Sequence, residues 1–97
     1  MKRGIRIPGH LQDLIRHLAP ELKRKIRMAL EEIAENSESG KPLKEDLQGF
    51  KSYKLGQFRI VYREASPSTI EITGIGPRTA IYQRMILEIR QRQSGEL

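Results

Sequence analysis

The sequence predicts a small α+β protein in which an N-terminal helical hairpin packs on one face of a small antiparallel sheet and a C-terminal helix follows. Two observations lead to this prediction. Apolar residues recur at helical spacing in two segments near the N-terminus and one near the C-terminus. Three segments between them have strand patterns and short connections. The expected order is β-α-α-β-β-β-α, in one domain spanning residues 1–97.

Two consecutive helices are expected in the first part of the chain. The first lies between Pro8 and Pro20, and its apolar residues have i, i+3, i+4, i+7 spacing: Leu11, Leu14, Ile15 and Leu18. The second begins at Pro20, which suits a first helical turn, and ends at the polar run 36–40; its apolar stripe is Leu22, Ile26, Ala29, Leu30 and Ile33. The short break between the two helices predicts an antiparallel hairpin.

Three strands are expected next, at residues 50–55, 58–64 and 69–75. Their connections are short, so an antiparallel meander is the simplest topology. Residues 2–7 are a candidate for an additional edge strand. The last element is a helix over residues 80–93, whose apolar positions are Tyr82, Met85, Ile86 and Ile89.

The strand at 58–64 alternates between two kinds of residue. Phe58, Ile60 and Tyr62 take every second position, and Arg59 and Arg63 lie between them. Because successive side chains of a strand point to opposite faces, the apolar set is expected in the core and both arginines on the other face.

Composition excludes several classes of protein and favours anionic partners. The chain has no cysteine, which excludes disulfides and cysteine-based zinc sites, and no apolar run near the ~20 residues of a membrane span. No apolar stretch follows the basic N-terminus as in a signal peptide, so a cytoplasmic location is expected. The net charge of +6 favours a nucleic acid or an acidic protein as partner. Segment 51–63 contains no acidic residue.

Familiar catalytic and metal-binding patterns are weak. His10 and His17 are too far apart along one helix to share a metal without other ligands. Gly74-x-Gly76 lacks the third glycine of a dinucleotide fingerprint. We therefore expect neither a metal site nor a cofactor.

A set of basic residues gives the strongest functional signal. Lys51 and Lys54 on one strand, Arg59 and Arg63 on the next, and Arg78 after the third are expected to converge on the sheet face opposite the hairpin. With Tyr82 beside them, they would attract phosphates and offer a stacking surface for a base, as in binding of single-stranded RNA. The alternative, a basic surface that only keeps the protein soluble, stays open.

Residues 42–82 resemble the RelE/ParE superfamily of type II toxins. The similar segments are LQG at 47–49, FRIVY at 58–62, IGPR at 75–78 and IY at 81–82, and the helices on either side fit the layout of the family. The resemblance implies a toxin that an acidic antitoxin holds inactive. It also implies one of two activities, since RelE-type members cut mRNA in the ribosomal A site and ParE-type members inhibit DNA gyrase.

The residues favour the RelE-like activity, and the family pattern maps onto Lys51, Lys54, Arg59, Arg78 and Tyr82. The resemblance implies a metal-independent endoribonuclease in which the ribose 2′-OH attacks the adjacent phosphate. Arg59 and Arg78 would stabilise the charge that develops on phosphorus, Lys54 would move protons, and Tyr82 would orient a base. RNA binding is assigned to Lys51, Arg63 and Arg84. A gyrase inhibitor and a non-catalytic basic binding module remain as alternatives.

Overall fold

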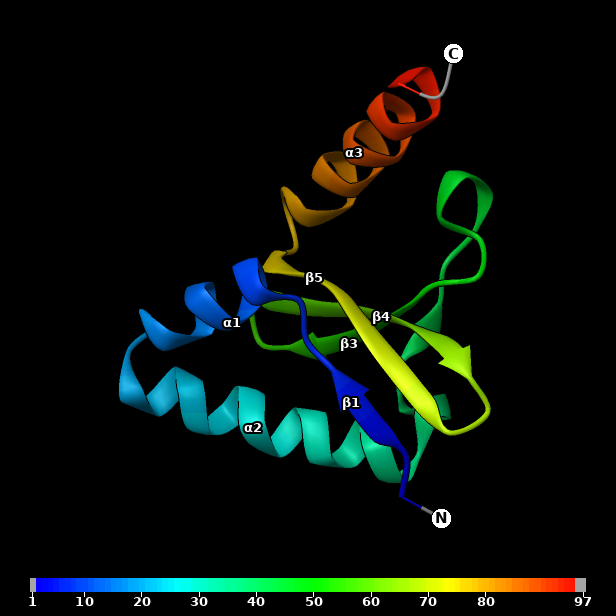
Figure 1. The fold of residues 1–97 in the computed structure, drawn as a ribbon. Coiled ribbons are helices and arrows are strands. Elements are labelled where there is room, and N and C mark those ends of the chain that lie inside the picture. Colours follow the sequence, from blue (N-terminus) through cyan, green and yellow to red (C-terminus); the bar gives the residue numbers. More distant parts are fainter. Residues whose placement is uncertain (1, 96–97) are drawn as a thin grey trace.

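A five-stranded sheet lies between the helices in the computed structural model, which describes residues 2–95 (Figure 1). The strands are β1 (Gly4–Arg6), β2 (Lys41–Pro42), β3 (Lys51–Leu55), β4 (Phe58–Ser66) and β5 (Thr69–Pro77). The helices are α1 (Gly9–Arg16), α2 (Pro20–Glu35) and α3 (Ile81–Gly95), with short 3-10 turns η1 (Ser37–Ser39) and η2 (Glu45–Leu47). The predicted order β-α-α-β-β-β-α is confirmed, and the short β2 is added to it.

The sheet has the strand order β1-β5-β4-β3-β2. The meander β3-β4-β5 is antiparallel, as predicted, and β2 also pairs antiparallel with β3. The N-terminal edge strand pairs parallel with β5, so the sheet is mixed rather than wholly antiparallel (Figure 1). This parallel pairing is possible because the helical hairpin carries the chain from the β1 edge to the opposite edge, and the meander then returns to β1.

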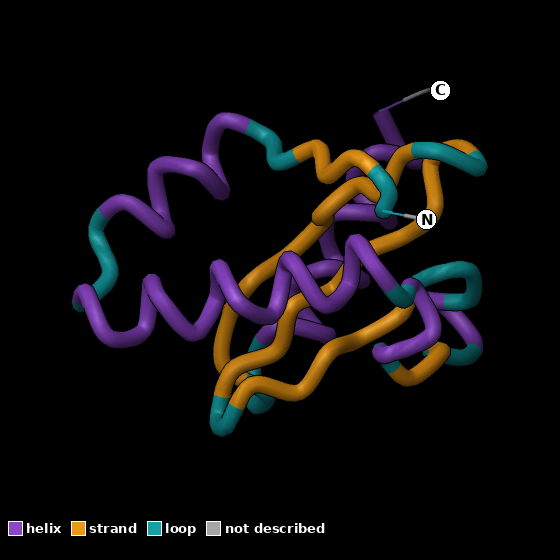
Figure 2. The backbone as a smooth tube through the Cα atoms, turned by 90° about the horizontal axis from the view of Figure 1, so that it is seen from below, coloured by secondary structure: helices purple, strands orange, loops and turns teal. Residues whose placement is uncertain are grey.

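The helical hairpin covers one face of the sheet, as predicted, and α2 runs along it (Figure 2). Pro8 precedes α1, and Pro20 occupies the first turn of α2, where the lack of a backbone N–H costs little. The apolar stripes of both helices meet the inward side chains of the strands in the main core: Leu11, Ile26, Ala29, Ile33, Ile60, Tyr62, Ile70, Ile72 and Ile75. The predicted inward positions 60 and 62 of β4 are fully buried.

The C-terminal helix packs on the opposite face and covers its centre. Ile81 and Met85 of α3 form a second buried cluster with Val61 and Leu47. Gly74 makes this close approach possible, because a Cβ there would lie 3.1 Å from Ile81 Cδ1 and 3.2 Å from Met85 Sδ. The face on which the basic residues were expected to converge is therefore covered at its centre.

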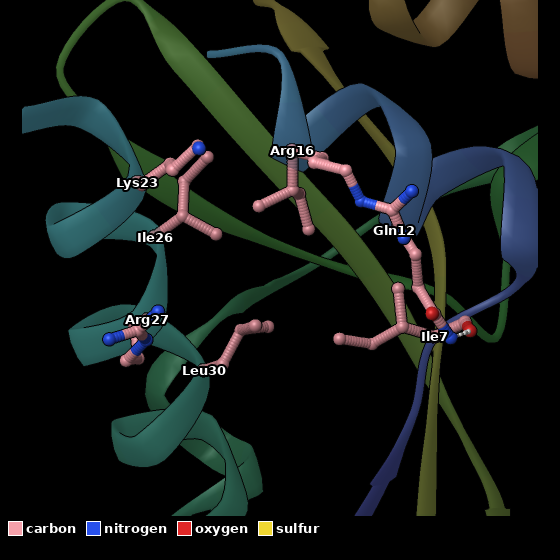
Figure 3. A pocket seen from close by; sticks show the side chains of 8 residues that line it. Ile7, Gln12, Arg16, Lys23, Ile26, Arg27 and Leu30 are labelled. Carbon is pink, nitrogen blue, oxygen red and sulfur yellow. Dashed lines mark hydrogen bonds between the residues drawn. The ribbon is translucent and has the colours of Figure 1, made fainter. Parts of the chain in front are cut away.

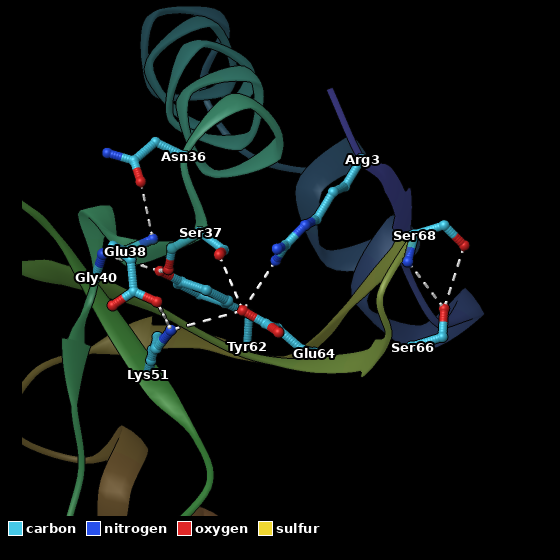
Figure 4. Close-up of polar contacts among 10 residues, drawn as sticks. All are labelled: Arg3, Asn36, Ser37, Glu38, Gly40, Lys51, Tyr62, Glu64, Ser66 and Ser68. Atoms are coloured by element: carbon cyan, nitrogen blue, oxygen red, sulfur yellow. Dashed lines mark hydrogen bonds and ion pairs between the residues drawn. The ribbon is translucent and has the colours of Figure 1, made fainter. Parts of the chain in front are cut away.

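A buried tyrosine joins the connection after α2 to the sheet. The Tyr62 hydroxyl donates to the Ser37 carbonyl and accepts from the Gly40 N–H, both at 2.8 Å (Figure 4). A Cβ at Gly40 would overlap the Tyr62 ring, since the ring carbons lie within 2.9 Å of its position. Glycine at position 40 is thus required by the approach of this ring.

Within residues 2–95, no helix combines the length and apolar character needed to cross a membrane.

Candidate functional site

Two predicted site residues lie directly opposite each other on the face that carries α3. Lys54 of β3 pairs in register with Arg59 of β4, and Ser52, on the same side of β3, pairs with the buried Val61 beneath α3. Side chains at such paired positions have Cβ atoms roughly 5 Å apart. Lys54 and Arg59 therefore place two positive charges side by side at the end of the sheet near the β3–β4 turn.

The Arg59 guanidinium is anchored by the turn that precedes it. Its Nη1 donates to the Gly56 carbonyl at 2.9 Å and to the Phe58 carbonyl at 2.8 Å, and the residue is half-buried. Gly56 has φ +60°, a conformation that glycine adopts readily and other residues rarely do. A tight turn therefore orients the arginine and leaves its other N–H groups for a ligand.

Arg78 and Tyr82 lie in the segment that follows β5, near the same end of the sheet. The backbone N–H of Arg78 donates to the Gln57 carbonyl at 2.9 Å, which holds the segment after β5 against the β3–β4 turn. Tyr82 lies in the first turn of α3, and its hydroxyl is 2.8 Å from Ser52 Oγ, two residues before Lys54 on the same face. We call Lys54, Arg59 and Arg78 the basic cluster, and Tyr82 lies at its edge.

The basic cluster is not neutralised by acidic neighbours. Within residues 2–95, no carboxylate lies within 4.0 Å of a charged nitrogen of Lys54, Arg59 or Arg78. Several other basic residues of the protein do form ion pairs, among them Arg3, Arg6, Lys51, Arg63 and Arg90. The cluster is thus a concentration of positive charge open to an anionic ligand.

Lys51 does not belong to the cluster, and the expectation that it converges there is wrong. It lies three positions before Lys54, so the pleat of β3 turns it to the hairpin side of the sheet. Its Nζ lies 2.8 Å from Glu38 and 3.7 Å from Glu64 (Figure 4). The hydrogen bond to Glu38 raises the pKa of Lys51 above its ordinary value. This lysine fixes the η1 segment against the sheet.

Arg63 also lies apart from the cluster, although it has the same parity as Arg59. Val61 lies between the two arginines and is buried beneath α3, so the helix divides this face into two regions. Arg63 Nη2 pairs with Glu71 Oε1 at 2.9 Å, in a hollow of about 290 Å³ that α3 also lines. The expected convergence is wrong here too, because α3 intervenes.

Arg84, the third residue assigned to RNA binding, is exposed on α3. It lies about 200° around the helix from Tyr82, since successive helical residues are about 100° apart. It lines a small hollow together with His10 and Leu14 of α1. Arg84 therefore lies on the side of α3 opposite to Tyr82, which contacts Ser52 of β3.

Glu71 lies between two arginines, and this arrangement predicts a pH dependence of stability. Burial alone would raise the pKa of Glu71, but hydrogen bonds from Arg6 and Arg63 outweigh it and hold the pKa below its ordinary value. A carboxyl with a depressed pKa in the folded state stabilises the protein above its unfolded pKa and loses that contribution as the pH falls.

Replacement Glu71→Gln should therefore lower the Tm at pH 7 and make the Tm fall less steeply as the pH drops below about 4.5. Thermal melts from pH 7 to pH 3 measure both effects. Glu31→Gln, an exposed change on α2, is the matched control and should follow the parent curve. An unchanged acid limb in the Glu71 variant would contradict the prediction.

A second concave surface lies in the helical hairpin. A cleft of about 540 Å³ between β1, α1 and α2 has apolar walls formed by Ile7, Ile15, Ile26 and Leu30 (Figure 3). Arg16, Lys23 and Arg27 also line it. It is on the opposite side of the sheet from the basic cluster, and the sequence analysis did not identify it. The signal that the sequence offers for it is the pair of cationic residues Lys23 and Arg27 on α2.

The part of the chain that the structure describes contains no group of three or more His, Cys, Asp and Glu side chains placed to hold a metal ion. His17 lies at the C-terminal end of α1, where its Nδ1 is 2.7 Å from the Asp13 carbonyl. His10 lies near Arg84 in the hollow described above. Neither histidine contributes to the basic cluster.

Comparison with known proteins identifies the class. One chain in the crystal structure of the toxin–antitoxin complex RelBE2 from Mycobacterium tuberculosis is similar in structure to this protein, with a TM-score of 0.69 and 22% sequence identity. The alignment covers 80% of this chain and 100% of the RelBE2 chain. At this identity the likeness shows a shared fold. No curated protein matches the sequence. The protein therefore has a fold that is also found in a toxin–antitoxin complex.

The family assignment follows from the sequence. Residues 9–82 match the family described as the ParE toxin of the type II toxin-antitoxin system parDE. The match runs from α1 to Tyr82 and so includes the helical hairpin, the meander and the basic cluster. The chain belongs to this family, within the RelE/ParE superfamily that the sequence analysis identified.

Proposed function

We propose that this toxin is an endoribonuclease that cleaves mRNA on the ribosome. The single observation that supports this function best is the pairing of Lys54 with Arg59, with Arg78 and Tyr82 at the same end of the sheet. Unpaired cations at this site suit a phosphodiester, and a neighbouring aromatic ring suits a nucleobase. RNA also supplies its own nucleophile, the 2′-hydroxyl.

Each residue has a role in this proposal. The 2′-hydroxyl attacks the adjacent phosphorus, the bond to the 5′-oxygen breaks, and the upstream fragment keeps a 2′,3′-cyclic phosphate. Arg59 and Arg78 stabilise the extra negative charge on the phosphate oxygens in the transition state. Lys54, paired in register with Arg59 on the neighbouring strand, assists proton transfer. Tyr82 orients the base beside the scissile bond.

The arginines provide the direct test. Arg59→Ala and Arg78→Ala should each lower the rate of mRNA cleavage on programmed ribosomes by about two orders of magnitude or more, because each removes donors aimed at transition-state charge. Both variants should still fold, since neither arginine has an ion-pair partner among residues 2–95 and the two hydrogen bonds lost with Arg59 go to carbonyls of its own turn. Single-turnover cleavage and thermal melts measure the two effects separately.

Arg24→Ala is the matched control for this test. It removes the same charge from an exposed position of α2, on the opposite side of the sheet, and should leave cleavage unchanged. Full cleavage by both the Arg59 and the Arg78 variant would show that the nuclease site is elsewhere or that the protein acts differently.

The second candidate function is inhibition of DNA gyrase. One observation favours it: the matched family bears the ParE name, and the resemblance implies gyrase as the target of ParE-type members. A supercoiling assay with purified gyrase distinguishes the two functions. Inhibition by the parent protein without any cleavage of ribosome-bound mRNA would replace the nuclease proposal.

An acidic antitoxin is the proposed protein partner. Membership of a toxin–antitoxin family supports it, and the net charge of +6 fits an acidic protein. Our expectation is that the antitoxin covers the basic cluster or displaces the helix that bears Tyr82. Solvent accessibility of Lys54 in the co-purified complex, measured by amine labelling, tests this. An accessible Lys54 and a protected Lys23 would instead place the antitoxin in the hairpin cleft.

A further inference from the structure

A buried serine lies next to the basic cluster, and the proposed reaction assigns it no role. Ser52 is in the middle of β3, and only 7% of its surface is exposed. Ser52 and Ser37 are the buried polar residues among those that the structure describes. The Ser52 hydroxyl lies 2.8 Å from the hydroxyl of Tyr82, 30 positions further along the chain, and either group can be the donor.

Packing alone does not explain a hydroxyl at this position. Ser52 is paired in register with Val61, which is fully buried against Ile81 and Met85. A hydroxyl in such surroundings is unfavourable unless it has a hydrogen-bond partner. Among residues 2–95, the hydrogen bond that the Ser52 side chain makes is the one to Tyr82. The serine hydroxyl and the phenol therefore satisfy each other.

This hydrogen bond restrains the ring of Tyr82. Tyr82 is half-buried in the first turn of α3 and packs at the margin of the cluster formed by Leu47, Val61, Ile81 and Met85. The bond to Ser52 draws the phenol to β3, two residues from Lys54 and on the same face.

We infer that Ser52 is a positioning residue that acts through Tyr82 and holds its ring beside Lys54 and Arg59. This inference rests on the proposed nuclease function, because it gives the ring a fixed place against the substrate. It makes a specific statement about energetics: the Ser52 hydroxyl affects cleavage only when the Tyr82 hydroxyl is present. A serine that merely stabilised the sheet would affect cleavage equally with or without that hydroxyl.

A double-mutant cycle tests this coupling. Ser52→Ala should slow single-turnover mRNA cleavage by about tenfold, with little change in KM. Tyr82→Phe should have the same effect, since each substitution removes the same hydrogen bond between the two hydroxyls. In the Tyr82→Phe background, Ser52→Ala should have less than a twofold further effect. Equal losses in both backgrounds, or unchanged cleavage by the Ser52 variant, would overturn the inference. Thermal melts of all four proteins identify any variant that fails to fold.

A second readout is independent of cleavage. The protein has three tyrosines, so the ring signals in a tyrosine-labelled NMR spectrum can be assigned by substitution. Ser52→Ala should change the chemical shifts of the Tyr82 ring, because the ring becomes more mobile and its signals are averaged over several positions. The chemical shifts of the Tyr53 ring should stay the same. Unmoved Tyr82 signals would overturn the inference even if the parent protein cleaves mRNA. A parent protein that does not cleave, with Tyr82 signals that do respond, would instead overturn the proposed function.

Discussion

Cleavage should stop when the 2′-hydroxyl of the nucleotide before the scissile phosphate is replaced by hydrogen. In the proposed mechanism the basic cluster supplies cations and hydrogen-bond donors for the phosphate, and the nucleophile comes from the RNA itself. Removing that oxygen eliminates the attacking group, so we expect the rate to fall by at least about three orders of magnitude. Binding should weaken little, because contacts to the phosphate oxygens remain.

Single-turnover cleavage of an mRNA with one 2′-deoxy position in the A-site codon measures this effect. The same substitution two codons downstream is the control and should leave the rate unchanged. The upstream product of the unmodified mRNA should end in a 2′,3′-cyclic phosphate or in the 3′-phosphate formed by its hydrolysis. Efficient cleavage of the deoxy substrate, or a 3′-hydroxyl on the upstream product, would falsify the 2′-OH mechanism even if the protein is a nuclease.

The strand pattern of the sequence predicted the part of the site that local geometry controls. Alternation along 58–64 placed Arg59 on one face and Ile60 on the other, and the structure confirms this because one of these faces packs against the helical hairpin. The same rule, applied to β3, would have separated Lys51 from Lys54. A spacing of three positions puts two strand residues on opposite faces. Lys51 was grouped with Lys54 because both lie on the same strand and both fit the family pattern, but the pleat of the strand places them on opposite faces.

The separation of Arg63 from Arg59 could not be read from the strand. It depends on α3, which crosses the sheet over Val61, and hence on glycine at position 74 of the neighbouring strand. In the sequence, Gly74 was considered only as part of Gly74-x-Gly76, which lacks the third glycine of a dinucleotide fingerprint. The role of Gly74 becomes clear only in the folded protein, where the absence of a side chain lets Ile81 and Met85 of α3 pack closely on the strand. Such long-range packing has no local periodicity and is set by tertiary structure.

The parallel pairing of β1 was unpredictable for a similar reason. Three residues, Gly4–Arg6, carry too little pattern to specify a partner or a direction. Their place follows from tertiary contacts, including the hydrogen bond from the backbone N–H of Arg3 to the Ala34 carbonyl at the end of α2 and the ion pair of Arg6 with Glu71.

Ser52 was missed because a serine in a strand ordinarily indicates solvent exposure. Only the position of Tyr82 shows that its hydroxyl is used.

Ile60→Asp should abolish folding, although position 60 is next to a residue whose loss should spare the fold. Ile60 has no exposed surface and lies in the main core among Ile26, Tyr62 and Ile75. A carboxylate there has no cation among its core neighbours and replaces a buried aliphatic side chain, which costs at least about 4 kcal/mol. Domains of this size are stabilised by only about 5–15 kcal/mol. We expect loss of the cooperative thermal transition in circular dichroism and loss of dispersed amide signals in NMR.

Two controls separate burial from charge in this experiment. Gln57→Asp adds the same charge at an exposed position of the β3–β4 turn and should leave the melt nearly unchanged. Ile60→Val keeps the position apolar and should cost only about 1 kcal/mol. A cooperative melt of Ile60→Asp within a few degrees of the parent would contradict the core assignment of this face. The outward direction of Arg59, which follows from the inward direction of Ile60, would then be wrong as well, so this variant also tests the structural basis of the proposed site.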